Sequence, residues 1–499
     1  MMMQASLPLL IIASSLLVGL IIFTLPEQRT HLRTTLNLAG ALIKLSLVIV
    51  MLWGVFHGQQ YQTQLPLVPG IDLVLRAGPL PLLFVTLSAV LWLLTTLYAI
   101  GYLEGSPHRS RFFGFFSLCV AATAGVALSG NLFTFLLFYE LLTLSTYPLV
   151  VHRGSEVARR AGQVYLAYTV GGGALLLIGI VWLYSLTGDL TFTPGGLGQA
   201  LEGHSRSVLI TIFALLIAGL GVKAALVPFH SWLPLAMVAP APVSALLHAV
   251  AVVKAGAFGI VLVLYEIFGI EFAAELGVTG PLAVLAAITI LYGSLRALYQ
   301  NDVKRRLAFS TVSQVSYIAL GVAILGPLAT IGGLVHLVHQ GLMKITLFFC
   351  AGNLAETLGI HKVEEMDGVG RRMPWTMGAF TLGALGMIGV PPLAGFISKW
   401  YLGLGALQAD QAWVLWVLIG SSLLNAGYFL PVLYRAWFRE PAGQWPQERH
   451  FGRKETAWLL LLPPLITAAM AVGAGLLAAI PFSPLQWVQF IVEGEGFLP

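Results

Sequence analysis

The chain has 499 residues, of which 58% are hydrophobic and only 9% are charged, and its mean hydropathy is +0.88. An ordinary soluble domain has about 25% charged residues, so these few charges cannot cover a soluble protein of this size. The formal net charge of +5 comes from the loops. The composition excludes a soluble enzyme, a disordered chain and a nucleic-acid-binding protein. It predicts an all-α polytopic membrane protein.

Runs of about 20 apolar residues, each long enough to cross roughly 30 Å of hydrocarbon, recur along the whole chain. We expect fourteen spans within a single membrane domain over residues 1–499, and we expect the first span to be retained because it lacks a small-residue cleavage site. The spans are expected at residues 7–25, 36–57, 79–100, 112–128, 131–151, 164–186, 207–229, 241–265, 279–299, 308–326, 330–354, 376–404, 411–438 and 456–480.

The basic residues of the loops support this number of spans. Seventeen Lys and Arg residues fall on odd-numbered loops, whereas even-numbered loops hold only Arg76 and Arg206. Because Lys and Arg concentrate on cytoplasmic loops, this asymmetry predicts that both termini face the outer side.

Five of the eight lysines are expected inside spans, and no arginine is expected there. These lysines are Lys44, Lys223, Lys254, Lys344 and Lys399. A charge at the bilayer centre costs about 2.5–3.5 kcal/mol on insertion scales. A buried lysine can release its proton whereas arginine cannot, so this choice indicates proton transfer rather than static anchoring. Lys44, in the second span, is given no role and is expected to reach the interface or a partner subunit.

The fifth and seventh spans contain a candidate ion pair. Glu140 is the only acid expected within a span, and a carboxylate at that depth must find a cation or a proton. Lys223 lies five residues before Pro228, which breaks the seventh helix, and His230 follows. The carbonyls freed by such a break must be buried in protein or line a wet cavity. The alternatives are a carboxylate that only fastens two helices and a kink needed only for packing.

The eighth and eleventh spans hold further candidate relay residues. In the eighth span, Lys254 follows His248 by six residues, which places the two on nearly opposite sides of a regular helix, and His248 is equally explained as a packing residue. The eleventh span has a polar residue every four positions, which predicts a row of hydrogen-bonding stations or an inter-helix seam. Its polar residues are His336, Gln340 and Lys344, with His339 beside them.

The twelfth span is broken by Pro391-Pro392 and is followed by Lys399. The two broken spans cross the membrane in opposite directions, which is typical of inverted repeats. The spacing predicts one repeat over residues 112–265 (spans 4–8) and another over residues 279–438 (spans 9–13), each forming a half-channel. Flanking helices are expected over residues 1–100 and 456–499.

The chain shows no sign of covalent chemistry. Its two cysteines, Cys119 and Cys350, lie in apolar runs, so neither a disulfide framework nor a cysteine metal site is expected. No nucleotide-binding motif is present. We therefore expect no cofactor, no metal and no nucleic-acid partner.

Four separated blocks resemble one known family. The blocks VPFHSWLPLAMVAPAPVSALLH, NDVKRRLAFSTVSQVSYIALG, HLVHQGLMKITLFFCAGN and GMIGVPPLAGFISKWYLG resemble the antiporter-like subunits shared by respiratory complex I, membrane-bound hydrogenases and Mrp-type sodium/proton antiporters. The resemblance covers roughly residues 75–440, and MDGVGRRMPWTMGAF looks closest to the D subunit of Mrp antiporters. It implies fourteen helices with two inverted five-helix half-channels, a bacterial cytoplasmic (inner) membrane, and other membrane subunits as partners.

The resemblance also implies roles for the buried residues. Glu140 resembles the ion-pairing acid and Lys223 its partner. Lys254 resembles the central relay lysine, His336 and Lys344 resemble bridging stations, and Lys399 resembles the terminal lysine of the second half-channel. One departure is Gln340, which stands where many relatives have a second histidine, so proton passage there would use water.

These observations predict a proton-translocating, non-enzymatic subunit of a multisubunit sodium/proton antiporter. One alternative is the proton-pumping membrane subunit of a redox complex related to complex I or to hydrogenases, because redox centres would lie on other chains. A second is a self-sufficient secondary transporter, which would be active as the purified chain alone. A third is a scaffold without transport, whose buried lysines would be replaceable by Leu or Met.

Overall fold

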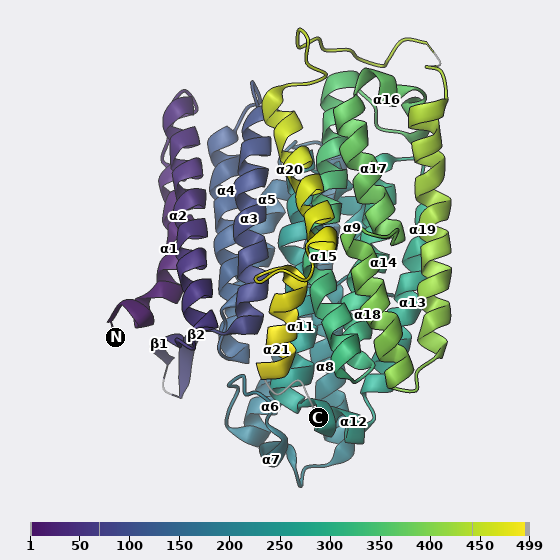
Figure 1. The fold of residues 1–499 in the computed structure, drawn as a ribbon. Helices are drawn as coiled ribbons and strands as arrows, with labels where there is room; N and C mark the ends of the chain where they lie inside the picture. Colours follow the sequence, from purple (N-terminus) through teal and green to yellow (C-terminus); the bar gives the residue numbers. More distant parts are fainter. Residues whose placement is uncertain (1, 69, 442, 495–499) are drawn as a thin grey trace.

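The structure is a computed structural model that describes residues 2–68, 70–441 and 443–494, and long helices dominate it (Figure 1). Within these residues, twelve helical segments are long and apolar enough to cross a membrane, and this confirms the prediction of an all-α polytopic membrane protein. The twelve are α1 (Met2–Phe23), α2 (Thr30–Phe56), α3 (Pro79–Tyr102), α4 (Arg109–Ala127), α5 (Leu132–Val150), α6 (Glu156–Thr187), α8 (Arg206–Lys223), the helical segment Ala241–Phe268, α13 (Thr279–Leu298), α15 (Pro327–Leu358), α19 (Trp413–Phe438) and α20 (Trp458–Leu476).

The other two predicted spans are also helical, but one is too polar and the other too interrupted to count among the twelve. α14 (Val303–Ala323) carries a run of buried hydroxyl and amide side chains. The twelfth predicted span consists of two short helices, α17 (Pro374–Ile388) and α18 (Ala394–Gln408). All three run alongside the other long helices (Figure 1).

The two predicted helix breaks are present. α8 ends at Lys223, and the chain turns past Pro228 before α9 (Trp232–Leu235) begins. α17 ends at Ile388 and is followed by Gly389, whose φ of +95° is a left-handed conformation that a side chain would disfavour. In both places a proline after the break prevents the helix from continuing.

A third break lies in the eighth span, which was expected to be one regular helix. α10 (Ala241–Ala245) passes into a π-helical turn over Leu246–Val250, and α11 (Val252–Leu262) starts after Ala251, whose φ and ψ are −118° and −84°. A second π-helical turn, Val263–Phe268, ends the segment. The expected angle between His248 and Lys254 is therefore wrong, because it assumed regular α-helical geometry.

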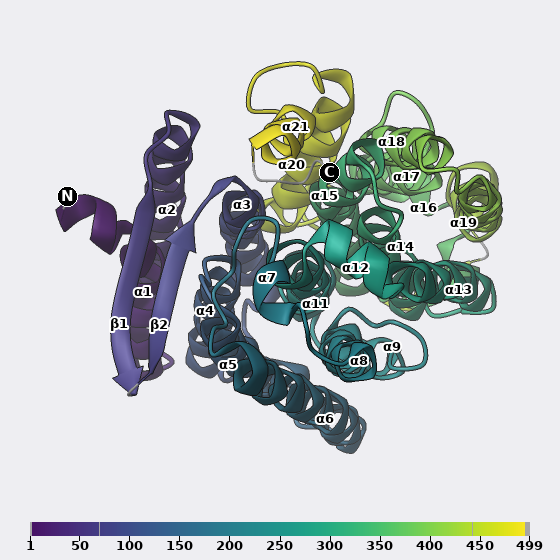
Figure 2. The same ribbon diagram turned by 90° about the horizontal axis from the view of Figure 1, so that it is seen from below.

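Short elements join the helices at the two ends of the bundle. An antiparallel hairpin of β1 (Tyr61–Val68) and β2 (Ile71–Ala77), which the sequence did not predict, lies beside the ends of α1 and α2 (Figure 2). Four further short α-helices are α7 (Gly198–Leu201), α12 (Ile270–Leu276), α16 (Val369–Arg372) and α21 (Pro484–Gly494), and two 3-10 helices cover Ala236–Val238 and Val363–Met366. The predicted flanking segment 456–499 extends past α21 into residues outside the described ones.

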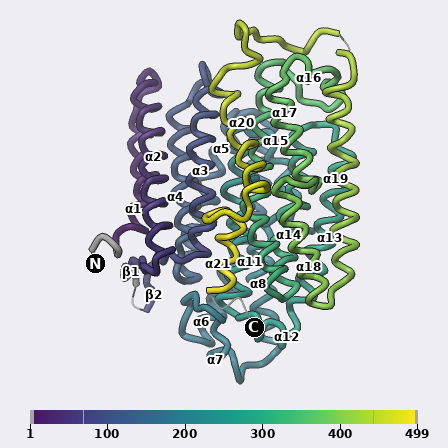
Figure 3. Tube along the Cα trace, in the orientation of Figure 1, coloured from purple at the N-terminus to yellow at the C-terminus, as the bar shows by residue number. Residues whose placement is uncertain are grey.

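α15 and the segment Ala241–Phe268 form the centre of the bundle. The most apolar 18-residue stretch of each is completely buried, and the tube view shows α15 and α11 among the other helices (Figure 3). α1, α2 and α6 lie at the periphery (Figure 2). The two central helices carry most of the predicted relay residues, so the fold encloses those residues in protein.

Candidate functional site

The structure brings Glu140 of α5 and Lys223 of α8 together. Glu140 Oε1 lies 4.0 Å from Lys223 Nζ. The Lys223 ammonium also donates to the Tyr139 carbonyl and lies 3.2 Å from the centroid of the Tyr139 ring. Lys223 is fully buried, whereas 33% of the Glu140 side chain is exposed. Glu140 is thus the outer member of the pair: its Oε1 is buried beside Lys223, while part of its side chain reaches the surface of the chain.

The helix break places Lys223 at the C-terminal end of α8, an end that favours a cation. Lys223 is the last residue of α8, where unpaired carbonyls give the helix end a partial negative charge. The Val222 carbonyl at this end accepts from the Ala225 N–H at 3.2 Å and from Trp232 Nε1, beyond the break, at 2.7 Å. His230, in the turn between them, packs edge-on against Tyr292 of α13, with 4.9 Å between ring centroids.

Lys254 begins the central part of the site. It lies in the first turn of α11, is fully buried, and its Nζ has no hydrogen-bond partner within the described chain. His248, before the break, stacks on Phe348 of α15 with ring centroids 4.5 Å apart. A buried, unpaired ammonium is too costly to persist. Lys254 must therefore either be hydrated or have an uncharged amine.

The predicted stations of α15 face different neighbours. Both ring nitrogens of His336 and both amide atoms of Gln340 are buried without partners among the described residues, as are both amide atoms of Gln314 on α14. His339 instead approaches α18, where its Nδ1 lies 3.0 Å from Ser398 Oγ. Because native interiors leave few polar groups unsatisfied, the three unpartnered side chains indicate bound water around this part of α15.

Lys344 starts a chain of direct hydrogen bonds that the sequence did not reveal. Its Nζ donates to Ser310 Oγ of α14 at 2.5 Å. Tyr428 Oη of α19 lies 2.8 Å from Ser310 Oγ and 2.7 Å from Asn425 Oδ1. The tyrosine hydroxyl has one proton, so if it donates to Asn425, Ser310 donates to it. All three bonds then point from Lys344 toward Asn425.

The chain of hydrogen bonds ends at Lys399, beside the break between α17 and α18. Asn425 Nδ2 donates to the Met387 carbonyl at 3.0 Å, and Lys399 Nζ donates to the same carbonyl at 3.2 Å. Lys399 also donates to the Ile388 carbonyl at 2.7 Å and to Ser422 Oγ at 2.8 Å. It lines a cavity of about 610 Å³ between α18 and α19. The carbonyls freed at the break are therefore the ligands of this ammonium.

Three charged residues outside the predicted row correct the sequence analysis. Glu140 is not the only acid in a span, because Glu266 is 4% exposed at the end of the segment Ala241–Phe268 and pairs with Arg76 of β2 at 2.6 Å. Arg33, which the expected span at residues 36–57 left in the loop before it, is buried in the first turns of α2. Lys44 reaches neither an interface nor the surface, since it is fully buried and donates to the Val120 carbonyl at 3.2 Å.

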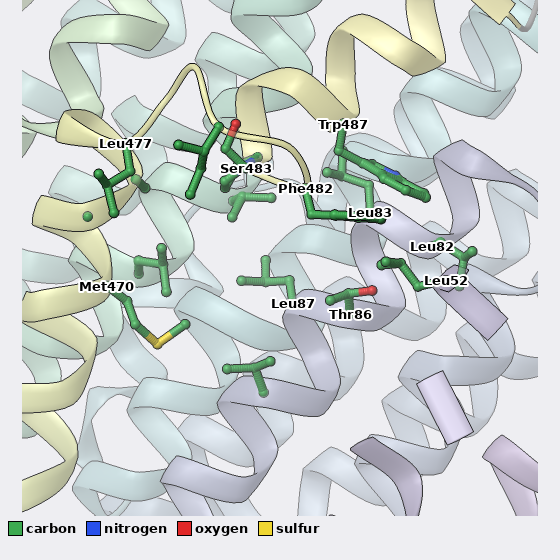
Figure 4. Close-up of a pocket in the computed structure, with 17 residues that line it drawn as sticks. Leu52, Leu82, Leu83, Thr86, Leu87, Met470, Leu477, Phe482, Ser483 and Trp487 are labelled. Atoms are coloured by element: carbon green, nitrogen blue, oxygen red, sulfur yellow. The ribbon is translucent and has the colours of Figure 1, made fainter. Parts of the chain in front are cut away.

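A separate cavity, of about 330 Å³, lies between α3, α15 and α20 (Figure 4). Leucines, valines and a methionine form most of its wall, and none of its lining residues is charged. It therefore offers no charged group to a proton, and it lies outside the row that runs from Glu140 to Lys399.

The fold and the row together define a polytopic membrane protein with a buried series of titratable side chains crossing its interior. Residues 129–425 match the family described as NADH:quinone oxidoreductase/Mrp antiporter, transmembrane. The chain belongs to this family. This confirms the resemblance inferred from the sequence blocks, and it makes the protein a membrane subunit of the antiporter-like type.

The chain is similar both to oxidoreductase subunits and to antiporter subunits of this family. The chain is 36% identical over 495 residues to NADH-quinone oxidoreductase subunit N of Desulforudis audaxviator, covering 95% of this chain and 96% of that one. It is 29% identical over 407 residues to the D subunit of the Na(+)/H(+) antiporter of Bacillus subtilis, covering 81% and 80%. The fold is also that of a chain in the Mrp complex from Dietzia sp., with a TM-score of 0.86, 23% identity and full coverage of both chains.

Proposed function

We propose that this chain is a proton-translocating subunit of a multisubunit sodium/proton antiporter. One observation carries the proposal: the buried row runs from Glu140 to Lys399 and approaches the surface at both ends, through α5 on one side and through the cavity beside α18 on the other. Family membership supports a role in ion translocation. The sodium ion is inferred from the names of the antiporter relatives.

In the proposed mechanism, a proton enters the half-channel of residues 112–265 and reaches Lys254. Movement of Glu140 away from Lys223 makes the charged form of the lysine less stable, because the compensating negative charge is lost. Each tenfold change in proton affinity corresponds to about 1.36 kcal/mol. The proton then passes through water near His336 to Lys344. It leaves by way of Lys399 in the half-channel of residues 279–438. Gln340 contributes a water-binding site to this route rather than a titratable group.

Partner subunits are part of the proposal. An exposed carboxylate in the hydrocarbon layer would be unfavourable, and Glu140 is exposed on α5 by a third of its side chain. A neighbouring membrane subunit that covers α5 and α6 would remove this carboxylate from lipid. The same surface would couple movement of the neighbour to the Glu140–Lys223 pair.

A redox-driven complex is the second candidate host. Identity to the oxidoreductase subunit N, at 36% over almost the whole chain, exceeds the 29% identity to the D subunit of the antiporter. Isolation of the native complex in mild detergent, with mass spectrometry of its subunits, separates the hosts. Iron–sulfur or flavin subunits would identify the redox machine, small hydrophobic subunits with a larger antiporter-like chain would identify the antiporter, and a chain that transports alone would refute both.

The test of the relay is the pair of variants Lys223→Ala and Lys254→Ala in the assembled complex. We expect each to abolish proton movement across everted vesicles, whereas Lys362→Ala, which changes a lysine whose side chain is 56% exposed, is expected to transport normally. Normal transport by both buried-lysine variants in a correctly assembled complex would show that the proposed mechanism is wrong.

A further inference from the structure

The apolar cavity of about 330 Å³ is large enough to hold a ligand. Figure 4 shows its wall, to which α3 contributes Leu83 and Leu87, α20 contributes Met470, and the start of α21 contributes Trp487. Protein interiors rarely leave voids of more than a water molecule. An apolar void does not hold ordered water, because water needs polar partners. The lining includes two hydroxyl groups: that of Ser483 is hydrogen-bonded within the chain, and that of Thr86 has no partner among the described residues. One hydroxyl is too few partners for ordered water, so the cavity favours an apolar occupant.

The cavity extends from one membrane interface toward the middle of the bundle. Its wall follows α3 from Leu82 to Val90, eight residues or about 12 Å of helix. Trp487, at the outer end, donates from Nε1 to the Pro79 carbonyl at 2.9 Å, at the first residue of α3. Aromatic rings gather there, as is typical of a membrane–water interface. The rings that contact one another are Trp53, Phe56, Phe482, Trp487 and Phe490.

The inner end of the cavity touches the back of the relay helix. Val338 and Leu342 of α15 line the cavity. Gln340 lies between them in sequence, and a separation of two residues turns a helix by roughly 200°, so its amide points away from the cavity. Whatever fills the cavity thus covers the side of α15 opposite the polar stations.

We propose that one acyl chain of a membrane phospholipid occupies this cavity and keeps water from the back of α15. The bilayer that surrounds a membrane-spanning chain supplies acyl chains directly. An acyl chain that enters the cavity past the aromatic rings runs from the interface to the middle of the membrane, as it does in the bilayer. No charged residue lines the cavity, so the site selects for the hydrocarbon chain and not for the charge of the headgroup.

The test is photochemical cross-linking of the intact complex with a phosphatidylcholine that carries a diazirine in the middle of one acyl chain. We expect cross-links to the peptides that contain Met470 and Leu342. Gly473 offers a way to fill the cavity, because it lines the cavity and a Cβ built on it meets no atom within 4 Å. Gly473→Phe is expected to reduce cross-linking to these peptides at least tenfold. Gly378→Phe, at an equally open glycine of α17 that does not line the cavity, is expected to leave it unchanged.

A second measurement tests whether the acyl chain stabilises the protein. We expect prolonged detergent washing to lower the Tm of the unsubstituted complex, phosphatidylcholine to restore it, and Gly473→Phe to show little of this dependence. If Gly473→Phe fails to assemble, Ala474→Leu places a smaller group in the same cavity and is expected to lower cross-linking about twofold. Cross-links that are absent from the lining peptides, or equal in the filled variants, would overturn the proposal. A co-purified isoprenoid molecule or a helix of another subunit in the cavity would also overturn it. None of these readouts requires proton transport, so their failure is distinct from failure of the proposed function.

Discussion

The hydrogen-bonded chain between Lys344 and Lys399 makes Tyr428 a sharp test of the relay. Tyr428→Phe removes a single oxygen that lies 2.8 Å from Ser310 Oγ and 2.7 Å from Asn425 Oδ1, and it leaves the aromatic packing in place. The Lys344–Ser310 bond is untouched. The substitution therefore breaks the hydrogen bonds that position Ser310 and Asn425 between the two lysines, and it removes no titratable lysine. The chain positions these groups but does not itself carry a proton to Lys399, because Asn425 and Lys399 both donate to the Met387 carbonyl.

The expected effect follows from the two bonds lost. A buried hydrogen bond contributes about 0.5–1.5 kcal/mol net, and more when its partner is left unsatisfied. If losing the two bonds raises the barrier to proton transfer by about 2–3 kcal/mol, the rate falls by about 30- to 150-fold, because each 1.36 kcal/mol is a factor of ten.

The assay is the initial rate of proton movement in vesicles, normalised to the amount of assembled complex. Tyr98→Phe is the matched control, because Tyr98 is also fully buried and donates to a carbonyl of α15, at Phe349, over 2.9 Å. We expect the control to retain most activity. A rate for Tyr428→Phe within threefold of the unsubstituted complex, or an equal loss in the control, would refute the role assigned to this chain of hydrogen bonds.

Three further predictions concern the rest of the molecule. A Cβ at Gly173 would lie 2.2 Å from the Glu140 carboxylate of the proposed ion pair, whereas a Cβ at Gly171 meets nothing within 4 Å. Gly173→Ala should therefore slow proton movement at least tenfold in the vesicle assay, and Gly171→Ala should leave the rate unchanged. Equal rates in the two variants would contradict the pairing. Glu266→Gln should lower stability by about 2 kcal/mol, less than the ~3–5 kcal/mol of a fully buried pair, because 30% of the Arg76 side chain is exposed; an unchanged Tm would argue against a structural role. Burial and nearby arginine charges lower the pKa of His152, in the loop after α5, to about 4. In the unfolded state the pKa of a histidine is near 6.5, so between pH 6.5 and 4 the unfolded state binds a proton that the folded state does not. The stability of the folded protein should therefore fall as the pH drops from 6.5 toward 4. The loss of Tm between pH 7 and 5 should be smaller in His152→Phe, and an equal loss would show that His152 is not responsible.

The membrane spans and the lysines of the row could be predicted from the sequence because hydrocarbon imposes strong local rules. A lysine in a span is costly wherever the helix is placed, so Lys223, Lys254 and Lys344 are conspicuous in the sequence itself. Prolines identify the breaks equally well, since Pro228 cannot continue a helix. The closeness of Glu140 to its lysine was predictable too, as a lone acid in hydrocarbon must find a cation.

The residues that connect these lysines could not be predicted, because Ser, Tyr and Asn are common in helices and cost little there. Tyr428 and Asn425 are three residues apart on one face of α19, and that spacing is the one signal the sequence offered. The π-helical turn over Leu246–Val250 has no breaker of its own in the sequence. Glu266 escaped notice since it lies one residue beyond the predicted end of its span, and its partner Arg76 is 190 residues away.

In the proposed relay, the groups that contact each of the four lysines indicate which step depends on an ion pair. Lys344 and Lys399 are held by hydroxyl and carbonyl oxygens, which stay neutral when the lysine releases its proton. Lys254 has no partner among the residues described. Lys223 alone of these four faces a carboxylate, and if Lys223 gave up its proton there, the negative charge would be left uncompensated. In the proposed mechanism, proton release is therefore most costly at Lys223 while Glu140 is near, and movement of that carboxylate controls it. The other three lysines need only water and a suitable neighbour.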